Sequence, residues 1–315
     1  VLQCVRELAY PVELYLEGDD RYQFWFQTSL WVAVAMGLSA PFKTVVGHSF
    51  FVDEEGAKMS KSKGNIIAPE EIYDVYGADV LRMWFTYADF RQKMFASEEI
   101  HNQVADAYKK IRFTVRFMLQ NCSDFDPADD AVPFEEMAEV DQWAMGRLQW
   151  LIDRMTRAFD NWDLHLFYHE MHSFCATDLS QFYLNVCKDR LYTDLPDSRD
   201  RRSAQTTLWN ILQALVRMVA PVLTYTSEEI WQHLRDRQPD MRESVQLADW
   251  PVVDEDIHNE DRLQRWDRFL QIRRQAMNAL EEAKNSGECD NPLEARLIIY
   301  ENEETREFLE SFENL

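Results

Sequence analysis

The sequence is poor in the features that define several classes of protein. Its five cysteines are widely spaced, odd in number and without a C-x-x-C pair, which argues against a disulfide scaffold and a thiolate zinc site. No apolar run approaches the roughly 20 residues that a transmembrane helix needs, so we expect no membrane partner and a soluble, cytoplasmic protein. The chain starts without Met and without a signal-peptide layout, so we expect it to be part of a larger protein.

Positive charge is also scarce, and it is unevenly distributed. The net charge is −23, from 33 basic and 56 acidic residues. That balance is unfavourable for binding nucleic acid, because phosphate contacts dominate such binding. Residues 49–116 are nearly neutral, with 10 basic and 11 acidic side chains, whereas residues 235–315 have 11 basic and 21 acidic. A nucleic acid would therefore meet local basic clusters and not the average field of the protein.

The hydrophobic pattern changes near residue 97. Before it, strand-like and helix-like pieces alternate, which is typical of a parallel α/β domain. After it, apolar residues such as Val104, Ile111 and Val115 recur at helical spacing. A capping box at Thr226-Ser227-Glu228-Glu229 predicts the start of one helix. We expect strands at 12–16, 44–52 and 297–300, and helices at 24–36 (buried), from 69, from 97, and at 134–159, 164–191, 202–219, 227–235, 255–285 and 303–312.

The most informative segment is Lys58-Met59-Ser60-Lys61-Ser62, which continues into Lys63-Gly64-Asn65. It places two or three ammonium groups and two hydroxyls on a short segment that ends in glycine. Such a loop suits closure over a polyphosphate, where it neutralises the charge that develops as a phosphate leaves. By composition alone, a Lys/Ser-rich stretch is more often a solvated loop, so its surroundings decide between the two interpretations.

Taken in order along the chain, the segments resemble the class I aminoacyl-tRNA synthetases. The lysine–serine motif matches the second signature of that family, and the helical part resembles its anticodon-binding domain. Within the class, the bacterial-type isoleucyl enzymes are most similar, and the valyl enzymes are the nearest alternative. The stretches that carry the isoleucyl resemblance include Tyr15-Leu16-Glu17-Gly18, Lys109-Lys110-Ile111-Arg112, Lys188-Asp189-Arg190-Leu191-Tyr192 and Arg201-Arg202-Ser203-Ala204-Gln205-Thr206.

The resemblance implies a division into two domains and a further piece. Residues 1–96 would be the end of a Rossmann-like, parallel-sheet catalytic domain that carries the lysine–serine loop. Residues 97–290 would be an all-α, helical-bundle anticodon-binding domain, and residues 291–315 the start of a truncated C-terminal module. The family's first signature, its editing insertion and its zinc module would all lie outside the chain. We therefore expect the isolated chain to be inactive and to hold no zinc.

The resemblance also implies chemistry and residue roles. The complete protein would join isoleucine to ATP, release pyrophosphate and transfer the acyl group to tRNA, with Mg²⁺ accompanying ATP and with the protein acting as a monomer. Lys61 would stabilise the ATP phosphates in the transition state, supported by Lys58. The implied catalytic residues are Lys58, Ser60, Lys61 and Ser62; the ATP contacts are Lys61, Lys58, Asp20, Gly18 and His48; and Glu17 would contact the aminoacyl-adenylate.

One departure from the family pattern keeps another interpretation open. The turn Asp19-Asp20-Arg21-Tyr22-Gln23-Phe24 replaces the family's usual Ser-Asp-Gln-His-Arg-Gly, and only Asp20 is kept. Nucleoside contacts from this turn are therefore in doubt. A non-catalytic RNA-binding module with a broken active site is the second hypothesis, and a purely structural helical scaffold is the third.

Two basic clusters are candidate tRNA contacts, since phosphate contacts come mainly from lysine and arginine. The alternative is a solvated helix face or a salt-bridged helix start. The candidates are Lys109, Arg112, Arg116, Lys188, Arg190, Arg201 and Arg202. Separately, His165, His169 and His172 lie on one predicted helix face, but they lack a paired carboxylate or a second cysteine, so we predict no metal site there.

Overall fold

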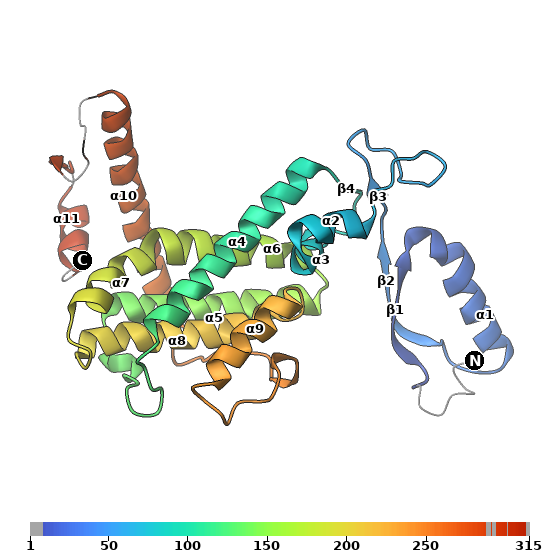
Figure 1. The fold of residues 1–315 in the computed structure, drawn as a ribbon, viewed down its shortest axis with the longest axis horizontal. Coiled ribbons are helices and arrows are strands. Elements are labelled where there is room, and N and C mark those ends of the chain that lie inside the picture. The colour runs from blue at the N-terminus through green and yellow to red at the C-terminus, as the bar shows by residue number, and fades with distance from the viewer. Residues whose placement is uncertain (1–8, 288–290, 292–293, 301, 313–315) are drawn as a thin grey trace.

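The computed structural model describes residues 9–287, 291, 294–300 and 302–312, and it consists of two regions that differ in packing (Figure 1). A small α/β region lies at one end of an elongated molecule, and a helical bundle makes up most of the rest. The predicted fold class, a Rossmann-like end followed by a helical bundle, is confirmed. Within the described residues, no helix is both long and apolar enough to cross a membrane.

The α/β region is built on two parallel strands. Strand β1 (Val12–Gly18) pairs with β2 (Phe42–His48), so that Gly18 lies opposite His48 at the carboxyl end of both strands. Parallel neighbours need a crossover connection. Helix α1 (Gln27–Ala35) provides it, preceded by a 3₁₀ turn (Asp19–Arg21) and a π-helical turn (Tyr22–Phe26).

This region buries few of its apolar side chains. Tyr15 is buried and stacks on Trp25 with 4.6 Å between ring centroids. In contrast, Trp31 and Val34 on α1 are each 62% exposed, and Leu16 on β1 is 53% exposed. The prediction of a buried helix here is therefore wrong for this chain: the helix forms, but Ala33 is its buried residue. Apolar residues all around a helix are typical of a helix that is packed on every side. Parallel sheets are normally packed on both faces. The exposed apolar side chains of α1 and β1 depart from both patterns.

A short connection joins the two regions. The predicted strand 44–52 is wrong in its continuity, because β2 ends at His48 and a separate strand, β3 (Phe51–Val52), pairs in parallel with β4 (Met94–Phe95). After β3 come the lysine–serine loop, helix α2 (Pro69–Tyr76) and helix α3 (Ala78–Trp84).

The helical bundle contains the main core, which includes residues of α2 and α3. Trp143 and Trp266 are fully buried in it, with ring centroids 5.6 Å apart. Among the described residues, this core begins at Ile72 and leaves out the buried residues of the α/β region. The remaining elements are α4 (Glu98–Asn121), a 3₁₀ turn (Phe134–Glu136), α5 (Glu139–Asp160), α6 (Leu164–Ser173), a π-helix (Phe174–Tyr183), α7 (Leu184–Thr193), α8 (Arg199–Val219), α9 (Thr224–Arg235), a 3₁₀ turn (Val245–Leu247), α10 (Glu260–Asn285) and α11 (Glu303–Glu310).

Most predicted helices are confirmed with shifted ends, but two local predictions are wrong. Helix α9 begins at Thr224, so Thr226 and Ser227 lie inside it and the predicted capping box does not form. The amide groups at its start are bound instead by Asp79, which lies far away in the sequence. Residues 297–300 form no strand, and their side chains are 43–94% exposed.

Candidate nucleotide and tRNA site

The lysine–serine loop is closed by one asparagine and one aspartate. The Asn65 side chain accepts a hydrogen bond from the Ser60 amide (2.9 Å) and donates one to Asp53 Oδ2 (2.7 Å). The other carboxylate oxygen of Asp53 accepts from the Ala57 amide (2.7 Å). Residues 53–65 therefore form a loop whose two ends are tied together by side chains. The sequence analysis assigned Asn65 no role of its own, although its place directly after Gly64 marked it as part of the motif.

The closed loop also sets the charge state of Asp53. Hydrogen bonds from Asn65 and from the Ala57 amide lower the pKa of its carboxyl below the ordinary value, because they stabilise the ionised form. The carboxylate thus stays charged, and keeps its two hydrogen bonds, over the whole physiological range.

The apex of the loop is a tight turn that presents Lys61 to solvent. The Lys63 amide donates to the Ser60 carbonyl (3.1 Å), and Gly64 adopts a φ of +70°, which an L-residue rarely takes. The Ser60 and Ser62 hydroxyls lie 3.3 Å apart, so the two predicted catalytic serines brace the turn by a hydrogen bond at the surface. Lys61 and Ser62 are exposed, as a phosphate-binding group must be before its ligand arrives.

The base of the loop is fixed to strand β3 and to the bundle. Lys58 bridges to Val52, the Met59 amide donates to the Phe51 carbonyl, and the Met59 side chain packs against the bundle core. The Lys58 ammonium group lies 3.4 Å from the centroid of the Phe50 ring, a cation–π contact. The two predicted catalytic lysines therefore differ: Lys58 is held on an aromatic ring, and Lys61 is free to reach a ligand.

The remaining predicted ATP and adenylate contacts gather at the carboxyl ends of β1 and β2. Glu17 and Gly18 end β1, His48 ends β2, and Asp20 follows in the first turn. A Cβ atom at Gly18 would lie 2.9 Å from Asp20 Oδ1 and 3.6 Å from the Phe50 ring, so a larger residue at this position would displace the Asp20 side chain. Phe50 thus contacts both the strand ends and Lys58. The structure brings the two predicted halves of the nucleotide site together at this ring, as expected for ligands bound outside the carboxyl ends of parallel strands.

The predicted tRNA contacts on α4 lie at the surface. Lys109 is 60% and Arg112 is 50% exposed, and Arg116 is exposed as well. Arg112 donates a hydrogen bond to the Tyr108 hydroxyl (3.1 Å) and lies 3.6 Å from Glu229 of α9. Lys188 on α7 is also exposed, so these four cations are accessible to a phosphate backbone.

Arg190, in contrast, belongs to a buried network. Its guanidinium donates two hydrogen bonds of 2.7 Å to Asp141, which also accepts from Ser203 (2.5 Å) and Tyr183 (2.7 Å) and is 0% exposed. Burial acts to lower the pKa of Arg190, but the hydrogen bonds and charge of Asp141 outweigh it and raise the pKa. Asp141 would be an unpaired buried charge without this arginine, so the geometry favours a structural role.

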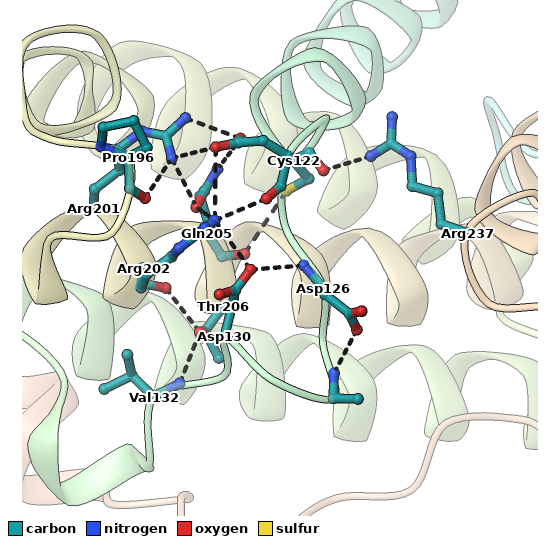
Figure 2. A network of polar contacts seen from close by, with 12 residues as sticks. Cys122, Asp126, Asp130, Val132, Pro196, Arg201, Arg202, Gln205, Thr206 and Arg237 are labelled. Atoms are coloured by element: carbon teal, nitrogen blue, oxygen red, sulfur yellow. Dashed lines mark hydrogen bonds and ion pairs between the residues drawn. The ribbon is translucent and has the colours of Figure 1, made fainter.

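Arg201 and Arg202 are likewise directed inward (Figure 2). Arg201 pairs with Asp124 at 2.7 Å and Arg202 with Asp130 at 3.2 Å, and the two guanidinium side chains are only 14% and 15% exposed. Hydrogen bonds from Arg201, helped by Gln205, lower the pKa of Asp124 to about 2. These pairs attach the segment that follows α4 to the start of α8. A salt-bridged helix start, the alternative weighed from the sequence, describes this geometry well.

The histidines of α6 do not form a metal centre in the structure. Within the described residues, no three His, Cys, Asp or Glu side chains gather closely enough to hold a metal ion. The ring of His172 stacks on Tyr168, and burial, together with Lys110 and His169, lowers the pKa of His172.

Comparison with known proteins agrees with this geometry. A family model described as class I tRNA synthetases (I, L, M and V) matches residues 4–97, and one described as the anticodon-binding domain of tRNA ligase matches residues 141–299. Isoleucine–tRNA ligase of Natranaerobius thermophilus is 48% identical over 98% of the chain. The chain belongs to the isoleucyl branch of the class I aminoacyl-tRNA synthetases. The resemblance predicted from the sequence is confirmed, and the valyl alternative is not favoured.

The chain matches only part of each relative in this family. The isoleucine–tRNA ligase of Caldanaerobacter subterraneus subsp. tengcongensis is 47% identical over the whole chain, which spans 34% of that enzyme, and the Natranaerobius enzyme is covered to 33%. The chain therefore spans about a third of the length of the curated relatives it matches.

Solved synthetase structures share the fold at low identity. The Agrobacterium radiobacter K84 agnB2 leucyl enzyme, solved in a ternary complex with tRNA and LeuAMS, superposes with a TM-score of 0.66 at 17% identity, covering 82% of this chain and 30% of that one. The Mycobacterium tuberculosis methionyl enzyme, solved with methionyl-adenylate, gives a TM-score of 0.57 at 20% identity, covering 70% and 44%.

Proposed function

We propose that this chain is the part of an isoleucine–tRNA ligase that contributes the lysine–serine loop and the anticodon-binding bundle. The observation that carries the proposal is the closed loop, which presents Lys61 while Phe50 joins its base to the strand ends that hold Gly18 and Asp20. The full enzyme would act in the cytoplasm as a monomer, on ATP with Mg²⁺, isoleucine and tRNA.

The arrangement suits adenylate formation. When the isoleucine carboxylate attacks the α-phosphorus, the bond to the bridging oxygen breaks and negative charge grows on the leaving pyrophosphate. The Lys61 ammonium group is exposed on a braced turn and is able to meet that charge. A preorganised donor of this kind lowers the barrier by about 3 kcal/mol. Glu17, at the end of β1, would contact the aminoacyl-adenylate.

For tRNA, we propose backbone contacts from the exposed cations Lys109, Arg112, Arg116 and Lys188. The three half-buried arginines, Arg190, Arg201 and Arg202, would support the surface and would not touch RNA. The contrast in exposure supports this division: Lys109 and Arg112 also have carboxylate neighbours, but their side chains are 60% and 50% exposed, whereas those of the three arginines are 14–17% exposed.

The test of the catalytic role is Lys61→Ala in the complete enzyme that contains this chain. We expect ATP–pyrophosphate exchange to fall by about two orders of magnitude, the typical cost of removing one transition-state donor. The matched control is Lys43→Ala, which removes the same charge from β2, where Lys43 pairs with the exposed Glu13. Exchange that stays at the wild-type rate in Lys61→Ala would refute the assignment.

A further inference from the structure

Helix α3 binds both sides of the break between α8 and α9. The carboxylate of Asp79 accepts hydrogen bonds from the amides of Tyr225 (3.2 Å) and Thr226 (2.7 Å), at the start of α9. One helical turn later, Arg82 donates to the carbonyls of Val222 (2.9 Å) and Pro221 (2.8 Å) in the break itself. One short helix therefore supplies acceptors to one side of the break and donors to the other.

The charges of Asp79 and Arg82 are opposite in sign to the partial charges of the backbone groups that they bind at the break. The first amides of a helix have no partner inside it and carry partial positive charge, so a carboxylate stabilises them. Residues local to α9 do not meet this need: Leu223 has no polar side chain, and the hydroxyls of Thr224 and Ser227 donate to carbonyls. Asp79 is only 6% exposed, so these two amides take the place of water as hydrogen-bond donors to its carboxylate.

The same helix supports the lysine–serine loop. Gly77, with a φ of +92°, joins α3 to α2, and α2 begins directly after the loop. Val80 and Met83 of α3 and Ile72 of α2 are buried in the bundle core, and Met59 of the loop packs against it. The orientation of α3 on the bundle thus determines where the loop stands.

The start of α9 also contacts the exposed basic face of α4. The Thr226 hydroxyl lies 2.9 Å from the Tyr108 hydroxyl, which in turn accepts a hydrogen bond from Arg112. An open cavity of about 330 Å³ adjoins these groups, lined in part by Gly77, Asp79 and Arg112. A continuous set of polar contacts therefore runs from Arg112, a proposed RNA contact, to Asp79 on α3.

We propose that Asp79 and Arg82 are positioning residues, which hold the lysine–serine loop in place by fixing α3 to the α8–α9 break. The catalytic consequence rests on the proposed function; the structural claim does not. Neither residue touches a reactant. Their effect passes through α3 and α2 to the loop, so RNA that binds Arg112 and shifts the start of α9 would also shift the loop.

The structural claim is tested by amide hydrogen exchange on the 315-residue chain. In Asp79→Ala and in Arg82→Ala we expect amides of α2 and α3 to exchange about 10-fold faster, since losing the contacts that fix α3 to the α8–α9 break makes local opening of these helices easier. Asp79→Asn keeps one acceptor and should give an intermediate rate. The matched controls are Asp153→Ala and Arg157→Ala, which break an exposed ion pair on α5 and should leave α2 and α3 at the wild-type rate.

The outcomes separate positioning from general destabilisation. If α5 and α8 keep wild-type exchange while α2 and α3 speed up, the proposal holds. If α2 and α3 keep wild-type exchange in Arg82→Ala and Asp79→Asn, or if they speed up only together with the whole bundle, it is overturned.

A kinetic measurement on the complete enzyme tests the consequence for catalysis. We expect Asp79→Asn and Arg82→Lys to lower kcat of ATP–pyrophosphate exchange several-fold, with the KM for isoleucine unchanged, because the loop is displaced while the amino-acid pocket is intact. A change confined to KM would contradict positioning. If the wild-type enzyme shows no ATP–pyrophosphate exchange at all, the proposed function fails. Amide hydrogen exchange would still decide the structural claim.

Discussion

The α/β region and the helical bundle differ in how far they bury their apolar side chains. In the bundle, Trp143, Trp266 and Tyr183 are completely covered. In the α/β region, Trp31 and Val34 of α1 are each 62% exposed, although that helix is apolar on every side. By burial alone, the bundle can account for its own stability, whereas the two-stranded sheet has little core of its own.

The proposed nucleotide site is divided between these two regions. Glu17, Gly18 and His48 belong to the poorly covered sheet, whereas the lysine–serine loop is packed on the bundle through Met59 and α2. The halves meet at Phe50. The position of Lys61, the proposed catalytic lysine, therefore depends on the bundle, whereas the strand ends belong to a sheet with little core of its own.

The largest expected effect comes from breaking the bundle at Asp141. Asp141→Ala removes a buried carboxylate and leaves Arg190 without its partner, which should lower the free energy of unfolding by about 3–5 kcal/mol. Urea unfolding followed by circular dichroism measures this loss. Asp153→Ala on the surface of the same helix should cost about 0.5 kcal/mol or less. Equal effects of the two substitutions would contradict the claim that the buried network around Asp141 stabilises the bundle more than an exposed ion pair of the same helix does.

A smaller effect is expected from opening the loop at Asn65. Asn65→Ala removes the hydrogen bonds to Ser60 and Asp53, and we expect ATP–pyrophosphate exchange in the complete enzyme to fall about 10-fold through misplacement of Lys61. Asn65→Asp should be worse, since it sets a second carboxylate against Asp53. Asn210→Ala, within α8, is the matched control. Wild-type exchange in both Asn65 variants would show that the loop needs no such closure.

The smallest effect concerns acid stability at Asp124. Its pKa in the folded protein is about 2, below the ordinary 3.8, so its contribution is complete above about pH 4 and is lost as pH falls towards 2. Discounted for a side chain that is 41% exposed, that contribution is about 1 kcal/mol. Asp124→Asn should therefore be less stable at pH 7 and lose less stability between pH 4 and 2 than the wild type. Parallel curves for the two proteins would contradict this.

Local patterns predicted much of the bundle, and long-range contacts explain what they missed. The spacing of Val104, Ile111 and Val115 placed α4, and each of these side chains is buried. The start of α9 was misplaced because its cap, Asp79, lies 147 residues from Thr226 in the sequence. No local pattern records such a pair.

The candidate site shows the same division. The lysine–serine motif was proposed as a phosphate-binding loop from its ammonium and hydroxyl groups, whereas Glu17, Gly18, Asp20 and His48 were proposed only through the resemblance to the family. The low exposure of Arg190, Arg201 and Arg202 was not evident from the sequence, since their carboxylate partners are 49 to 77 residues away. Exposure, which separates a structural arginine from one that contacts RNA, is a property of the folded chain.

Native-state hydrogen exchange of the wild-type chain in increasing denaturant tests the central claim most directly, because it ranks the opening free energies of segments within one molecule. We predict that amides of β1, α1 and β2 exchange at the lowest denaturant concentration, and that amides of α2 and α3 exchange only with α8 of the bundle. Exchange of α2 and α3 together with β1 and β2, before the bundle opens, would show that the lysine–serine loop belongs to the sheet and would contradict the account.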